Sequence, residues 1–266
     1  MKLNQVAILV LVAASLAMTA CANGGAKTDP VPPPASGNWL FIETSTAHPD
    51  FPTPTYYRGP LQDANGTVTA TLVYSGSSCL PNSPVDFTGN ASQNALTLTS
   101  GTDNGQVMTI TGDINFDGTV VGTYSKPGGG AASCSDDSGT VYGTAVPLLA
   151  GNWSGTLSRA TNGAINVTAA LQQQSTATSD GLYPLTGTVT FANDSCFTSG
   201  AIDSTQSYIT GEQVVIVATS GASSLTLDGY LINPTLSTAI KITQYSVAGC
   251  FTEYGTGELD MRTHAF

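Results

Sequence analysis

Apolar and polar residues alternate with a period of two over several short stretches of this chain. In residues 66–73, Val68, Ala70 and Leu72 alternate mainly with threonines. Because successive side chains of a strand point to opposite faces, this pattern predicts a β-strand with one apolar face. The same alternation occurs in residues 94–100, 106–114, 183–191, 212–220 and 224–232.

Turn-forming residues separate these stretches at intervals of about 8 to 12 residues, which predicts about seven or eight strands per domain. The pairs Asn65-Gly66, Asp117-Gly118 and Asn162-Gly163 are typical of two-residue hairpins. No stretch sustains the 3.6-residue period of an amphipathic helix. We therefore expect an all-β protein made of antiparallel β-sandwich or small β-barrel domains, and the pattern does not choose between these two.

The chain contains an internal repeat. The tripeptide Gly-Asn-Trp occurs at 37–39 and at 151–153, two cysteines follow it in each half, and a Gly-Thr pair follows the second cysteine. These landmarks recur in the same order with shifts of 114 to 117 positions, which predicts two homologous domains. The predicted organisation is a signal peptide at 1–20, a tether at 21–36, a first β-domain at 37–147 and a second at 150–263.

Five cysteines are present, so at least one has no partner within the chain. In the repeats, 55 residues separate Cys79 from Cys134 and 54 separate Cys196 from Cys250. Of the three ways to pair four cysteines, pairing within each domain is the simplest, which predicts Cys79–Cys134 and Cys196–Cys250. Each bridge would stabilise its domain by roughly 4 kcal/mol in the chain-entropy description. Cys21 is then left over.

Cys21 follows a segment with the features of a signal peptide. Lys2 precedes the apolar run 6–18, which is shorter than the roughly 20 residues of a membrane span. Residues 18–21, Met-Thr-Ala-Cys, resemble the lipobox of bacterial lipoproteins, with methionine in place of the usual leucine. The resemblance implies that Cys21 becomes the first residue and is acylated by fatty acids such as palmitate. The alternative is simple secretion after cleavage by an ordinary signal peptidase.

The lipobox resemblance also implies a location. In many lipoproteins an aspartate directly after the cysteine retains the protein in the inner membrane, and here that residue is Ala22. We therefore expect a lipid-anchored protein of the outer membrane, facing the periplasm or the cell surface. The Gly-, Ser- and Pro-rich tether 21–36 suits a folded body held away from a bilayer. The body resembles the disulfide-bearing all-β repeat lipoproteins of bacterial envelopes, which implies no particular activity.

The charge balance limits the possible partners. Only 9% of the residues are charged, with 7 basic against 18 acidic residues. Nucleic acid binding needs clustered Lys and Arg, so the composition argues against it. We expect the lipid bilayer, through acylated Cys21, to be one partner, and an envelope protein or a glycan to be another.

A partial match to a calcium loop lies at residues 113–118. Asp113, Asn115 and Asp117 would offer oxygen ligands to a hard cation. The twelfth position of the loop is Tyr124 instead of the glutamate that the motif requires. The favoured interpretation is therefore a hairpin turn, and we expect neither a metal nor a cofactor.

The stretch 48–59 combines aromatic, charged and proline residues, which is the composition of a recognition surface. Its candidate binding residues are His48, Asp50, Phe51, Tyr56, Tyr57 and Arg58. The alternative is an ordered loop that packs on its own domain or covers the seam between the domains. Trp39 and Trp153 hold matched positions in the repeats and are interpreted as core residues rather than sugar-stacking platforms.

The sequence contains little that favours catalysis. It has two histidines, no G-x-S-x-G or HExxH motif and no paired Cys/His zinc spacing. We therefore expect no enzyme activity and a structural or interaction role in the envelope. The alternative is a module that binds glycans or small apolar ligands. A hydrolase, a more remote third option, would need two carboxylates facing each other across a cleft.

Overall fold

A computed structural model of the chain describes residues 35–47, 54–75, 84–92, 94–102, 106–128, 136–159, 163–192, 194–236 and 238–261. Within these ranges every regular element is a β-strand. The first eight are β1 (Gly37–Ser45), β2 (Thr55–Ala64), β3 (Thr67–Ser75), β4 (Val85–Ser92), β5 (Ala95–Ser100), β6 (Thr109–Ile114), β7 (Thr119–Lys126) and β8 (Asp137–Val146). The others are β9 (Ala150–Arg159), β10 (Gly163–Gln173), β11 (Tyr183–Ala192), β12 (Ser199–Ile202), β13 (Tyr208–Thr210), β14 (Gln213–Ser220), β15 (Ser223–Leu231), β16 (Ala239–Val247) and β17 (Phe251–Met261).

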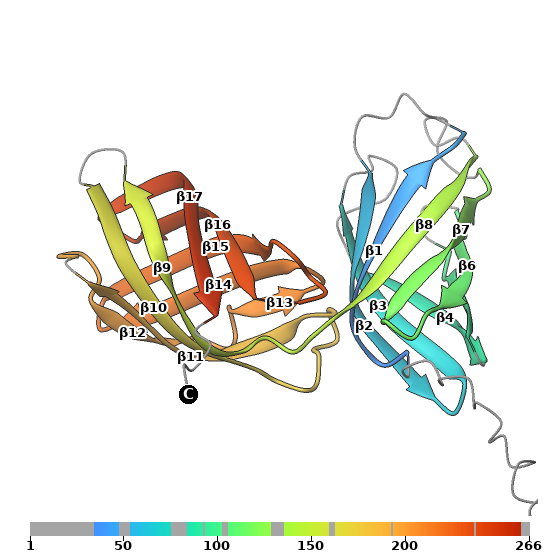
Figure 1. Cartoon of the computed structure of the whole chain (residues 1–266), viewed down its shortest axis with the longest axis horizontal. Coiled ribbons are helices and arrows are strands. Elements are labelled where there is room, and N and C mark those ends of the chain that lie inside the picture. Colours follow the sequence, from blue (N-terminus) through green and yellow to red (C-terminus); the bar gives the residue numbers. More distant parts are fainter. Residues whose placement is uncertain are drawn as a thin grey trace, which may run out of the picture. The chain divides into compact units, whose positions relative to one another are not determined.

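Strands β1 to β8 form a closed antiparallel barrel, called barrel 1 below (Figure 1). Each strand pairs with the next along the chain, and β8 pairs back with β1 from Asn38↔Val146 to Ser45↔Gly139. Short hairpins join several strands at one end. In the hairpin between β2 and β3, Asn65 and Gly66 have φ angles of 57° and 87°. These positive values are those of the type I′ turn that an Asn-Gly pair predicts.

Strands β9 to β17 form a second closed barrel, called barrel 2 (Figure 1). Their order is β10-β9-β17-β16-β15-β14-β12-β11-β13, and pairing between β10 and β11 closes the ring. The short strands β12 and β13 both pair with β11 and with β14. Together they therefore take the place of a single strand, and the barrel has eight strand positions around its circumference. The structure therefore has closed barrels, where the sequence left sandwich and barrel open.

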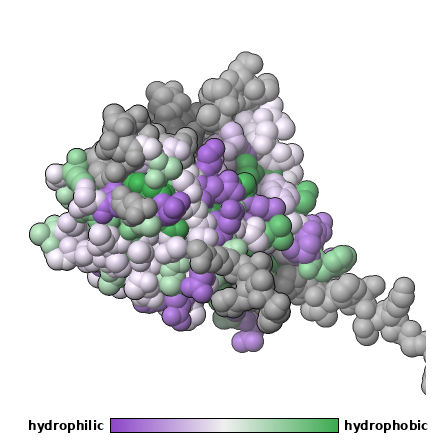
Figure 2. All heavy atoms as spheres, turned by 60° about the vertical axis from the view of Figure 1, so that its left-hand side comes forward, coloured by the Kyte–Doolittle hydropathy of each residue, from purple (hydrophilic) through white to green (hydrophobic). Residues whose placement is uncertain are grey.

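The predicted alternation is confirmed in the cores. In β3, Val68, Ala70 and Leu72 are buried while Thr67 and Thr69 are exposed. An eight-stranded barrel is just wide enough for such inward side chains to fill it. The outward faces carry many threonines, and Figure 2 shows a surface that is mostly of intermediate hydropathy.

The two tryptophans confirm the core interpretation. Trp39 and Trp153 are each 0% exposed, in β1 and in β9 respectively. The Trp39 indole N–H also donates a hydrogen bond to the Ala35 carbonyl at 2.7 Å. Because neither ring faces solvent, neither is a platform for sugar stacking.

Barrel 2 contains the predicted disulfide between Cys196 and Cys250, whose Cα atoms are 6.2 Å apart. It links positions 54 residues apart in the chain. The other predicted pair, Cys79–Cys134, lies outside the described residues, as do Cys21, the signal peptide and most of the tether.

Candidate functional site

A buried ion pair lies inside barrel 1, at the end where β1 and β7 stop. Glu43 follows Trp39 and Phe41 on the inward face of β1, and Lys126 follows Tyr124 on that of β7. The Glu43 and Lys126 side chains are 1% and 7% exposed, and Lys126 Nζ lies 2.5 Å from Glu43 Oε2. No motif marks either residue in the sequence. They can be located by extending the period of two beyond the last apolar residue of each strand, which places both side chains on the inward face.

Two aromatic rings surround the Lys126 ammonium. Its Nζ lies 5.2 Å from the ring centroid of Tyr57 and 4.9 Å from that of Tyr124. Such cation–π contacts are worth about 2 kcal/mol or more when the cation is desolvated. The ring of Tyr74 packs beside Tyr57 at a centroid distance of 5.6 Å. Lys126 is therefore held by a carboxylate and by tyrosine faces.

Asp137 extends this arrangement toward the rim of the barrel. Its carboxylate accepts hydrogen bonds from the Tyr124 hydroxyl at 2.8 Å and from the Ser45 hydroxyl at 2.6 Å. Asp137 also stands opposite Lys126 in the β7–β8 register. We call the following residues the polar cluster: Glu43, Tyr57, Tyr124, Lys126 and Asp137.

Burial raises the pKa of Glu43 to about 7. The Lys126 ammonium opposes this rise, and the Asp137 carboxylate adds to it. Burial also raises the pKa of Tyr57 well above its ordinary value, with a contribution from Glu43. The Tyr57 hydroxyl interacts with the Glu43 carboxylate, but neither it nor Glu43 Oε1 has a hydrogen bond of regular geometry within the described structure. One carboxylate oxygen of Glu43 therefore contacts Lys126, and the other can accept a further hydrogen bond.

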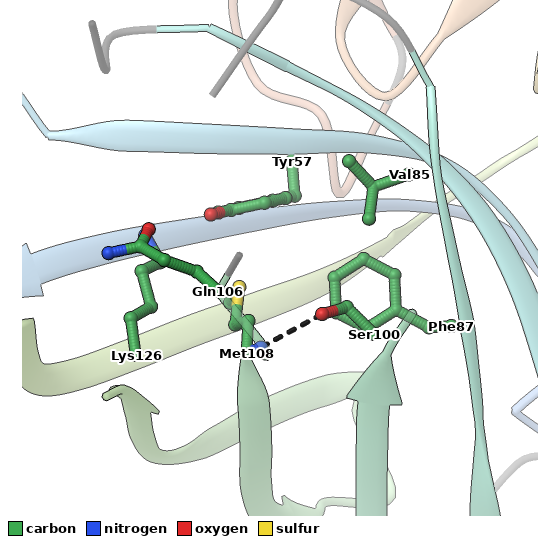
Figure 3. Close-up of a pocket in the computed structure, with 7 residues that line it drawn as sticks. All are labelled: Tyr57, Val85, Phe87, Ser100, Gln106, Met108 and Lys126. Carbon is green, nitrogen blue, oxygen red and sulfur yellow. Dashed lines mark hydrogen bonds between the residues drawn. The ribbon is translucent and has the colours of Figure 1, made fainter. Parts of the chain in front are cut away.

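A small cavity adjoins the polar cluster. Its volume of about 10 Å³ is enough for one water-sized group. Figure 3 shows the polar ends of Tyr57, Gln106 and Lys126 on one side of it, and Val85, Phe87 and Ser100 on the other. The lining residues are Tyr57, Val85, Phe87, Ser100, Gln106, Met108 and Lys126.

The corresponding place in barrel 2 is apolar. Leu157 stands four residues after Trp153 in β9, just as Glu43 stands four residues after Trp39 in β1. Leu157 is 0% exposed and belongs to the hydrophobic core of barrel 2. A barrel of this kind therefore accepts an apolar side chain where barrel 1 has a charged one.

Three residues of the predicted binding loop lie in strand β2 instead: Tyr56, Tyr57 and Arg58. Because a strand turns successive side chains to opposite faces, Tyr57 points into the core, where it is 0% exposed, and Arg58 points out of it. Arg58 Nε donates to both carboxylate oxygens of Glu212 at 3.0 Å, and its guanidinium lies 4.8 Å from the Tyr56 ring centroid. These three residues therefore do not form one recognition loop. The other members lie outside the described residues: His48, Asp50 and Phe51.

Arg58 belongs to a seam between strands of barrel 1 and the turn before β14. Asn38 Nδ2 donates to the Gly211 carbonyl at 3.0 Å, and Asn38 Oδ1 accepts from the Gly211 N–H at 2.8 Å. Leu40 and Val146 pack into the hydrophobic cluster of barrel 2. Arg58 therefore pairs with a carboxylate beside these contacts.

The partial calcium motif forms a hairpin turn. Asp117 Oδ1 accepts hydrogen bonds from the backbone N–H of Thr119 at 3.0 Å and from its hydroxyl at 2.7 Å, and these bonds lower the pKa of Asp117. Asn115 donates to the same hydroxyl at 3.0 Å, while Asp113 lies in β6. Within the described ranges, no group of three or more His, Cys, Asp or Glu side chains is arranged to hold a metal ion.

Comparison with models of known protein families, with curated proteins and with solved structures found no match to this chain. In the part of the chain that the structure describes, no helix has the length and apolarity needed to cross a membrane.

The raised pKa of Glu43 predicts that the protein loses stability as the pH rises from about 4.5 to about 7. Between these values the folded protein binds more protons than the unfolded chain, so the free energy of unfolding falls with increasing pH. The stability that comes from protonated Glu43 is fully present below pH 4.5 and is lost as the pH rises through about 7. Urea unfolding of wild type and Glu43→Gln over this range measures it. Parallel pH profiles for the two proteins would contradict the assignment.

Proposed function

We propose that this protein is a lipid-anchored protein of the bacterial envelope with a structural or interaction role and no catalytic activity. The observation that carries the anchoring is the Met-Thr-Ala-Cys motif at 18–21, placed directly after an apolar signal-like run. The packed interiors of the two barrels support a body that presents its outer faces to partners. The proposed location is the outer membrane, with Cys21 as the attachment point.

Acyl chains on Cys21 would supply the membrane affinity. Each buried CH₂ group contributes about 0.8 kcal/mol, so one chain holds a protein reversibly and two or more hold it stably. The sequence has 7 basic and 18 acidic residues, so electrostatic attraction to an anionic membrane surface does not add to this affinity.

Replacing Cys21 by alanine is expected to remove the protein from the washed membrane fraction, because no acylation takes place without the thiol. Cell fractionation followed by intact-mass measurement of the N-terminal peptide checks this result. The mass is needed because an uncleaved signal peptide can also hold the variant at the inner membrane. Asn23→Ala is the matched control, since it alters the same segment and leaves the cysteine in place.

Two outcomes would overturn the anchoring proposal. One is a wild-type N-terminal peptide that carries an unmodified Cys21. The other is a mature protein that begins at Asn23. Either result would mean that the protein is secreted without an anchor.

A second candidate function is the binding of a small ligand inside barrel 1. The observation that favours it is the polar cluster beside the cavity, since the matched position in barrel 2 holds Leu157. Ligand sites typically combine apolar walls with a few polar groups, and perturbed pKa values gather at such sites. The cavity of barrel 1 has both features, since burial raises the pKa of Tyr57, one of its lining residues.

A further inference from the structure

The ion pair in barrel 1 is not required by a barrel of this kind. Barrel 2 closes around Leu157 at the position that Glu43 occupies in barrel 1. A buried ion pair also adds little stability over packed apolar residues of similar volume, because desolvation offsets the attraction between the charges. Charged residues that a core does not need are expected where a protein has a functional site.

The charge that faces the cavity is positive. Lys126 is among the residues that line it, while Glu43 lies behind Lys126 and is not one of them. Largely apolar walls come from Tyr57, Val85, Phe87 and Met108. Ser100 and Gln106 add two uncharged polar side chains. A ligand that matches this lining has a small anionic head and an apolar body.

We propose that the cavity of barrel 1 binds a small monocarboxylate with an apolar body, whose carboxylate pairs with Lys126 in place of Glu43. This inference rests on the second candidate function above and names the ligand class for it. The cavity holds about one water-sized group, so a longer ligand requires Gln106 and Met108 to rotate. Both side chains are unbranched, and methionine adapts readily to a new shape.

Binding of the anion is balanced by uptake of one proton. In the free protein the Lys126 ammonium is neutralised by the Glu43 carboxylate. When the ligand carboxylate takes over that ion pair, Glu43 takes up a proton and becomes a neutral carboxylic acid. Because the pKa of Glu43 is about 7, its protonation costs little free energy near neutral pH. Among the described residues, the other titratable groups that face Glu43 are Asp137, Tyr57 and Tyr124, and none of them takes part in this step.

The test is titration calorimetry of the purified full chain with butyrate. Butyramide and butylamine serve as neutral and cationic probes of the same size. We expect saturable binding of one butyrate, and little binding of the amide or the amine. Above pH 7 the affinity is expected to fall about tenfold per pH unit, because one proton is taken up with each ligand. Titrations in two buffers of different ionisation enthalpy measure that proton directly.

Three variants separate the roles of the two charges. Glu43→Gln is expected to bind butyrate with an affinity that no longer depends on pH, because its amide carries no proton to gain. Glu43→Leu combined with Lys126→Met mimics the apolar core of barrel 2 and is expected to bind at least about tenfold more weakly, since a charged hydrogen-bonding partner is lost. Lys241→Met removes an exposed lysine of barrel 2 and should bind like wild type.

Several results would overturn the inference. Absence of saturable butyrate binding at millimolar concentration is one, and unchanged binding in the double variant is another. Tighter binding of butylamine or butyramide, abolished in the double variant, would reject the carboxylate while keeping a ligand site in barrel 1. None of these results bears on Cys21 anchoring, which has its own fractionation test.

Discussion

Replacing Lys126 by methionine is expected to lower the free energy of unfolding of barrel 1 by about 3–5 kcal/mol. The substitution keeps an unbranched side chain of similar length, so the lost contribution is chiefly the charge. The Glu43 carboxylate, 1% exposed, is left without its cation in a low-dielectric core. The loss should be largest at pH 8 and smaller at pH 5, because a protonated Glu43 does not need a cation and its pKa is already about 7.

The double variant Glu43→Leu/Lys126→Met decides whether this loss comes from the unpaired charge. Removing both partners is expected to be neutral or to stabilise the barrel by up to about 4 kcal/mol, as for other buried pairs replaced by apolar residues. Leu157 shows that leucine fits at the matched position of barrel 2. A double variant as unstable as Lys126→Met would contradict this explanation and point to loss of packing around Tyr57 and Tyr124.

The measurement is denaturant unfolding followed by tryptophan fluorescence. The chain has two tryptophans, one in each barrel. In a Trp153→Phe background, Trp39 alone reports on barrel 1. Lys241→Met is the matched control, because Lys241 is exposed and its loss should change stability by no more than about 0.5 kcal/mol.

Replacing Cys196 and Cys250 by alanine is expected to destabilise barrel 2 by roughly 4 kcal/mol. The bridge spans 54 residues, so its loss frees many conformations of the unfolded chain. The native turn at the first cysteine keeps other support, since Asp194 Oδ1 accepts hydrogen bonds from the N–H groups of Cys196 and Phe197 at 2.6 and 2.9 Å. We therefore expect the fold to persist with lower stability.

Trp153 fluorescence in a Trp39→Phe background follows this loss in barrel 2. The control is the parent protein with the Cys196–Cys250 bridge reduced, whose Trp153 transition should coincide with that of the double alanine variant. A loss below about 1 kcal/mol would contradict the loop-entropy argument and indicate that the unfolded chain stays compact without the bridge.

The local pattern of the sequence was a good guide to which side chains face inward. The alternation at 66–73 correctly placed Val68 and Leu72 in the core, and matched positions in the repeat correctly placed both tryptophans. The spacing of cysteines in the repeat also predicted the Cys196–Cys250 bridge. These features depend on residues near one another in the chain, or on a copy of the same local pattern.

The interpretation of residues 48–59 as one loop was wrong for residues 55–59, because the contacts that decide their structure are not local. Prolines and polar residues there favour a loop, yet β2 begins at Thr55 because its pairing with β1 and β3 satisfies the backbone. Tyr57 then faces the core and Arg58 faces Glu212, which lies 154 residues further along the chain. No local property of the stretch reports on that partner.

The sequence by itself determined the all-β class, the inward and outward faces of the strands, the two-fold repeat and the tight Asn-Gly turn. Only the tertiary structure decided that each repeat closes into a barrel, because closure requires β1 to pair with β8 and β10 with β11. It alone also joined Glu43 to Lys126, which are 83 residues apart. The physical reason is that a period of two fixes the face on which a side chain lies, whereas the strand it meets across the barrel depends on how distant edges pair.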